Sequence, residues 1–145
     1  MAGGGCECIG ACNYPDDQTV DEGDSWTQHI AGRYETPALF SFCTNKFNAY
    51  IEIDDGGWKN MDDTTPIKLV SGLLPQSIDG QVGGCNAQNT PRATFGLQAA
   101  IGSGGSTYHC RGRIDDGIGV LDDYTYFDIT VNPSGVGQVI NVITN

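Results

Sequence analysis

Apolar and polar residues alternate over several short segments of the chain, which is the period expected of half-buried β-strands. The segments are 39–43, 49–53, 67–70, 107–114, 124–131 and 136–143. Clusters of Asp, Asn, Gly and Ser separate them, and these residue types favour turns. The best helical window, residues 93–100, carries a central Gly96 and fits a strand better. The pattern therefore predicts an all-β fold, an antiparallel β-sandwich.

One local motif adds detail to this fold. Tyr108-His109-Cys110 resembles the Tyr-x-Cys that opens strand F of immunoglobulin-like domains, where the tyrosine forms a corner. Cys43 lies upstream and Trp58 follows it by 15 residues, so the order of Cys, Trp and Tyr-x-Cys is similar to the family pattern. Trp58 departs from that pattern because it follows a turn cluster. The resemblance implies an immunoglobulin-like sandwich, and a jelly roll would show the same spacing.

The first 24 residues differ from the rest of the chain. Residues 3–12 are small, glycine-rich and cysteine-rich, and residues 16–24 are strongly acidic. Neither stretch carries enough apolar surface to bury by itself. We therefore expect an extended, cysteine-rich N-terminal arm over residues 1–24 and a β-sandwich domain over residues 25–145.

Cysteine usage is unusual, with three of the six cysteines close together near the N-terminus. The six are Cys6, Cys8, Cys12, Cys43, Cys85 and Cys110. Disulfide bonds from the arm to the body, or between chains, are the preferred interpretation, and they indicate that the protein functions in an oxidising environment. A second interpretation is a zinc or iron–sulfur site with three arm thiolates and Cys110, Cys43 or His109 as the fourth ligand, although the spacing is not that of known sites. Free, buried thiols are the third. We expect cross-links and no metal or other cofactor.

The charge balance excludes one class of partner. Seven Lys and Arg against 18 Asp and Glu give a formal net charge of −11, so the chain lacks the basic surface of a nucleic-acid binder. There is no apolar run of about 18 residues, so we expect no membrane span. The sequence as written also shows no secretory signal.

A basic stripe is predicted on one strand. In residues 107–114, a period of two places His109, Arg111 and Arg113 on the same face. One interpretation is pairing with acidic residues of the same sheet, such as Glu52. The other is a docking strip for an acidic partner, including a second copy of this chain.

Catalytic motifs are missing from the sequence. The chain has two histidines, which limits acid–base and triad schemes, and Ser103 lies in a glycine-rich turn without the strand–turn–helix context of a nucleophile elbow. We therefore expect a protein that is not an enzyme.

The overall style of the chain resembles that of the head-decoration, cement, linking, neck and tail accessory proteins of tailed bacteriophages. These proteins are small, acidic or neutral, β-rich and glycine-rich, and they reach a neighbour with an N-terminal arm. The resemblance implies a disulfide-linked capsid decoration subunit in the virion, forming a homo-oligomer such as a trimer and contacting the major capsid protein. Release within a particle would also explain cysteine cross-links without a secretion signal. The alternatives are a secreted immunoglobulin-like binding module and a small domain with a Cys-ligated metal.

Overall fold

Two β-sheets make up the described part of the molecule. The structure, a computed structural model, describes residues 9–34, 46–82, 92–116 and 122–134. Sheet A has the strand order β1 (Ile9–Tyr14), β3 (Ser25–Tyr34), β9 (Arg92–Ala99) and β6 (Ile67–Ser71), with β8 (Gln81–Val82) also paired to β3. Sheet B has the order β2 (Gln18–Asp21), β11 (Asp122–Asn132), β10 (Ser106–Asp115), β4 (Lys46–Asp54) and β5 (Trp58–Asn60), with β7 (Gln76–Asp79) also paired to β4.

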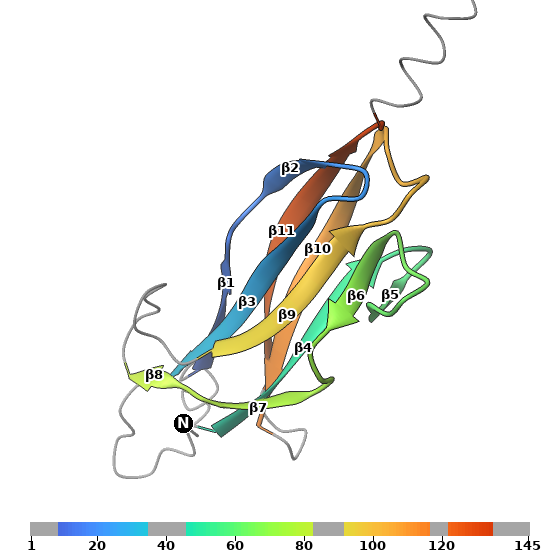
Figure 1. Ribbon diagram of the computed structural model, residues 1–145. Helices are drawn as coiled ribbons and strands as arrows, with labels where there is room; N and C mark the ends of the chain where they lie inside the picture. Colours follow the sequence, from blue (N-terminus) through green and yellow to red (C-terminus); the bar gives the residue numbers. More distant parts are fainter. Residues whose placement is uncertain (1–8, 35–45, 83–91, 117–121, 135–145) are drawn as a thin grey trace, which may run out of the picture.

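The prediction of an all-β fold is confirmed. The two sheets form the two layers visible in Figure 1. Most neighbouring strands are antiparallel, but β2 runs parallel to β11 and β8 runs parallel to β3. The described residues form no helix, and so none that could cross a membrane.

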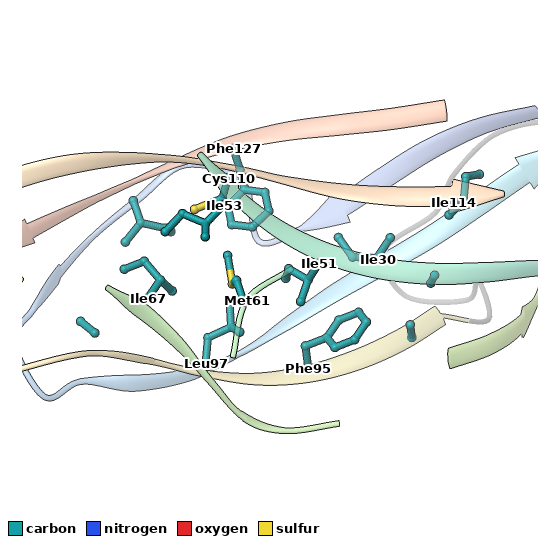
Figure 2. Packing of buried hydrophobic residues seen from close by; sticks show 14 of the residues in the cluster. Ile30, Ile51, Ile53, Met61, Ile67, Phe95, Leu97, Cys110, Ile114 and Phe127 are labelled. Carbon is teal, nitrogen blue, oxygen red and sulfur yellow. The ribbon is translucent and has the colours of Figure 1, made fainter. Parts of the chain in front are cut away.

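The core lies between the sheets, where each strand contributes every second residue. In β9, Ala93, Phe95, Leu97 and Ala99 are fully buried, and the residues between them face outward. Figure 2 shows this layer, to which β4 adds Ile51 and Ile53 and β10 adds Cys110. Each large apolar side chain buried in this way contributes roughly 1.5–3 kcal/mol. The alternation of apolar and polar residues in the sequence therefore corresponds to the two sides of each sheet.

Several strands lie where the pattern predicted them. Segments 49–53, 67–70, 107–114 and 124–131 fall within β4, β6, β10 and β11, and the segment around Gly96 is β9. Segments 39–43 and 136–143 lie outside the described residues. The central strand β3 was missed because one of its inward positions is a glutamine. Buried Gln28 donates its Nε2 to the Pro15 carbonyl at 2.7 Å and accepts from Trp26 Nε1 at 3.1 Å.

The prediction of an N-terminal arm is wrong for residues 9–24. β1 pairs with β3 along its whole length, and β2 pairs with β11, so this stretch supplies a strand to each sheet. Backbone hydrogen bonds hold it in place instead of a large apolar surface. Asp123 Oδ2 accepts from the Ala11 N–H at 2.8 Å, and Asp17 Oδ1 accepts from the Asp128 N–H at 2.8 Å. A small and acidic composition therefore does not exclude a strand, because an edge strand is held by its backbone hydrogen bonds to the neighbouring strand.

Candidate functional site

The predicted basic stripe lies on the outer face of sheet B. Along β10, buried and more exposed residues alternate, so His109, Arg111 and Arg113 face outward while Cys110 and Ile114 enter the core. The face assignment made from the period of two thus holds in the structure.

A single carboxylate joins the two arginines of the stripe. Arg111 Nε donates to Glu52 Oε1 at 2.6 Å, and Arg113 Nε donates to Glu52 Oε2 at 3.2 Å. Arg113 also donates through an Nη to Asp115 Oδ2 at 2.9 Å. The Glu52 and Arg111 side chains are only 10% and 15% exposed, so solvent screens this pair weakly. The pairing with Glu52 considered in the sequence analysis is present, and it neutralises the arginines locally.

Aromatic rings surround the same arginines. The Arg111 guanidinium lies 4.2 Å from the ring centroids of both Trp58 and Tyr124, and the Arg113 guanidinium lies 3.7 Å from that of Tyr50. Such cation–π contacts add about 0.5–2 kcal/mol each, depending on how far the cation is desolvated. We define the aromatic–arginine cluster as the set Tyr50, Glu52, Trp58, Arg111, Arg113, Tyr124 and Tyr126.

Part of this cluster is open to solvent. Tyr126 is 58% exposed and Trp58 is 37% exposed, and their rings contact each other edge-on with centroids 5.9 Å apart. Tyr126 also stacks on Tyr124 with a centroid separation of 6.3 Å. The cluster therefore presents rigid aromatic surface above an internally neutralised charge pair.

Electrostatics favour the charged form of each cation on this face. Burial alone would lower the pKa of Arg111, but the hydrogen bond and the negative charge of Glu52 raise it overall. The hydrogen bond that the Asp128 carboxylate accepts from His109, and then the charge of that carboxylate, raise the pKa of His109 above the ordinary 6.5. His109 Nδ1 lies 2.8 Å from Asp128 Oδ1.

A second group of cations lies on the outer face of sheet A, where the sequence analysis did not look. Arg33 of β3, Arg92 of β9 and Lys68 of β6 point away from the core. None of the three forms an ion pair within the described part of the chain. The signal was present in the sequence, because segments 25–34 and 92–99 contain no Asp or Glu.

The pKa of His29, the histidine of sheet A, is lowered. Burial, followed by the charge of Arg92, lowers the pKa of His29 below the ordinary 6.5. Its Nδ1 lies 3.3 Å from Thr94 Oγ1 on the neighbouring strand. The strands of sheet A carry three basic and no acidic residues, and we call their outer surface the acid-free face.

The structure describes two of the six cysteines, and they differ in state. Cys12 is disulfide-bonded, and Cys110 is a free thiol buried beside Ile53 and Phe127 (Figure 2). Burial raises the pKa of the Cys110 thiol, so it stays protonated and acts as a small apolar residue. Cys6, Cys8, Cys43 and Cys85 lie outside the described residues.

Other candidate chemistry is occupied by structural contacts. The Ser103 hydroxyl donates to the Ala100 carbonyl at 2.5 Å, within its own turn. Asp62, which is followed by a second aspartate, accepts from the backbone N–H and the hydroxyl of Thr64. The described ranges contain no group of three or more His, Cys, Asp or Glu side chains that could hold a metal ion.

Comparison with known proteins identifies no family for this chain. No family model and no curated protein matches it. Among solved structures, it is similar to a conjugative transposon lipoprotein from Bacteroides eggerthii, with a TM-score of 0.47 and 10% sequence identity over 83% of this chain and 95% of the other. At that level of similarity we carry no function across from the lipoprotein.

The comparisons give the sequence-based assignment no support. The solved structure reported above is that of a conjugative transposon lipoprotein, at a similarity too low to carry a function. The predictions of a tailed-phage virion protein, a disulfide-linked capsid decoration subunit and a virion location are withdrawn. The two alternatives, a secreted immunoglobulin-like binding module and a Cys-ligated metal domain, also find no support. The disulfide bond at Cys12 further removes that residue as a thiolate ligand.

Proposed function

We propose that the two sheets form an immunoglobulin-like sandwich. The order β1–β3–β9–β6 corresponds to strands A, B, E and D, and the order β11–β10–β4–β5 corresponds to G, F, C and C′. The Tyr108 hydroxyl donates to the Ser103 carbonyl at 2.7 Å, five residues upstream, as in a tyrosine corner. Trp58 does not take the place of the core tryptophan of that fold, because it lies exposed on β5.

For function, we propose a non-enzymatic domain that associates with copies of itself through the aromatic–arginine cluster. The observation that supports this is the pair of exposed rings, Trp58 and Tyr126, above two mostly buried arginines on a rigid sheet. These three residue types dominate the binding energy of protein–protein interfaces, because they bury much surface with little loss of side-chain freedom.

The charge of the chain favours contact at this cluster. Copies with a net charge of −11 repel each other over most of their surface. Within the cluster, Glu52 and the neighbouring Asp115 balance Arg111 and Arg113. This region can therefore approach another copy of the chain with less repulsion than an acidic loop can.

Sedimentation velocity over a range of protein concentrations tests the proposal. We expect wild-type protein to form species larger than a monomer, and the double variant Trp58→Ala with Tyr126→Ala to remain monomeric. The control replaces two apolar residues that are more exposed and lie outside the cluster, Leu73→Ala with Ile101→Ala, and should associate like the wild type. Wild-type protein that stays monomeric at every concentration would contradict self-association.

A further inference from the structure

The two sheets carry opposite charge. The strands of sheet A contain Arg33, Lys68 and Arg92 and no acidic residue, which gives a formal charge of +3. The strands of sheet B contain four basic and eight acidic residues, which gives a formal charge of −4. A molecule with a net charge of −11 thus keeps one sheet free of acidic side chains.

The cations of sheet A are arranged on one surface. Arg92 pairs across the ladder with Ala31, which lies two residues from Arg33 on β3, so both arginines share the outer face. Lys68 of β6 pairs with Gln98 of β9 and faces the same way. The Arg33 guanidinium lies across Gly10 of β1, where any Cβ would come within 2.7 Å of its Nε. A larger residue at position 10 would displace the arginine from this place.

We propose that the acid-free face of sheet A in one copy binds the outer face of sheet B in the next copy. This inference rests on the proposed self-association and names the second surface that takes part. Pairing two copies of sheet B would place two faces of charge −4 together, and pairing two copies of sheet A would place two cationic faces together. The contact of A with B brings opposite charges together.

The two faces are complementary in the types of side chain they carry as well as in the sign of their charge. Arginine and lysine bind over aromatic rings, and Tyr126 and Trp58 offer exposed rings on sheet B. Arginine also forms paired hydrogen bonds with carboxylates, and Asp122 and Asp128 lie on β11 of that sheet. The cations of sheet A, which form no ion pair within the described residues, thus find both of their preferred partners on sheet B.

The geometry of assembly follows from the use of two different surfaces. A contact between unlike surfaces is head-to-tail, and it leaves a free A face and a free B face at the ends of every open assembly. Growth therefore continues until a ring closes, whereas a symmetric contact between like faces stops at a dimer.

A complementation experiment tests this inference. The A-face variant carries Arg33→Ser, Lys68→Ser and Arg92→Ser, and the B-face variant carries Trp58→Ala and Tyr126→Ala. We expect each variant alone to be monomeric by sedimentation velocity. An equimolar mixture should form a heterodimer that grows no further, because one intact A face meets one intact B face.

A control and a salt series accompany the mixture. The control variant Lys46→Ser with Lys59→Ser removes two positive charges from sheet B, where both lysines are paired with aspartates, and it should assemble at least as strongly as the wild type because the B face becomes more negative. Raising the ionic strength tenfold from about 0.05 M should weaken the wild-type assembly at least tenfold, because the faces attract through screened charges. Circular dichroism confirms that each variant is folded.

The outcomes separate the two proposals. An A-face variant that associates like the wild type, while the B-face variant does not, overturns the head-to-tail contact and leaves self-association standing. Two monomeric variants that do not combine when mixed also overturn it. A wild-type protein that is monomeric at every concentration overturns both proposals. A heterodimer in the mixture supports both.

Discussion

The outer faces of the two sheets use arginine in opposite ways. On sheet B, Arg111 and Arg113 are held by Glu52, covered by aromatic rings and largely buried. On sheet A, Arg33 and Arg92 have no ion-pair partner among the described residues. A basic residue is therefore available to a partner only where its own sheet leaves it unpaired, and the neighbouring strands decide this.

The pKa values of the two described histidines are shifted in opposite directions. His29 on sheet A has a lowered pKa, through burial and then the charge of Arg92, and His109 on sheet B has a raised pKa, through Asp128. The ordinary value of 6.5 lies between them. Burial is the main cause of the His29 shift, and the smaller charge contribution, from Arg92, has the opposite sign to that of Asp128 on His109.

The largest effect is expected from removing the shared carboxylate of sheet B. Glu52→Gln leaves Arg111 without a charged partner in a site where its side chain is 15% exposed. Breaking a mostly buried ion pair costs about 3 kcal/mol of unfolding free energy, measurable by urea denaturation. The matched control, Asp79→Asn, breaks the exposed pair with Lys46 and should change stability by less than about 0.5 kcal/mol. Equal losses in the two variants would refute the distinction.

The next largest effect is a loss of stability that should differ between an arginine on sheet B and an arginine on sheet A. Arg111→Gln removes a charge-assisted hydrogen bond and two ring contacts, and should destabilise the fold by about 2 kcal/mol. Arg33→Gln removes an unpaired cation and should stay within about 0.5 kcal/mol of the wild type. Thermal unfolding of the two variants side by side measures the difference, and a larger loss for Arg33→Gln would contradict the assignment of the two faces.

A smaller effect is expected at the turn that joins the sheets. Tyr108→Phe removes the hydroxyl that donates to the Ser103 carbonyl and keeps the ring. The loss of one partly buried hydrogen bond should cost about 1 kcal/mol, measured by urea denaturation. The control Tyr124→Phe removes a hydroxyl that makes an exposed contact of 3.5 Å with Asp122, and it should cost much less. No loss in Tyr108→Phe would argue against a structural tyrosine corner.

The smallest effects are those on the two histidines. By NMR titration we expect His29 to titrate below 6.5 and His109 above it, with Arg92→Gln raising the pKa of His29 and Asp128→Asn lowering that of His109. Because the pKa of His109 is raised on folding, its contribution to stability is present below pH 6.5 and is lost as the pH rises through its folded pKa. The reverse order of the two pKa values would contradict the charge difference between the faces.

Much of the sheet structure could be predicted from the sequence because side-chain alternation is a local property. Strands β4, β6, β9, β10 and β11 show it, since every second residue enters the core. Strand β3 does not show it clearly, because an inward position is Gln28, whose hydrogen bonds go to Trp26 of the same strand and to the Pro15 carbonyl, which the folded chain brings close. β1 and β2 also lack a clear alternation of apolar and polar side chains, because these strands are held by backbone pairing and by hydrogen bonds of Asp17 and Asp123.

The sequence by itself determined the all-β class, the outward direction of His109, Arg111 and Arg113, and the acidic character of the chain, since each depends on residue type and a period of two. Only the tertiary structure decided which cations remain unpaired. Glu52 is 59 residues from Arg111 in the chain, and the pairing of β4 with β10 places them side by side. Ion pairs act over a few ångströms, so the register of strands far apart in sequence determines which charges face a partner.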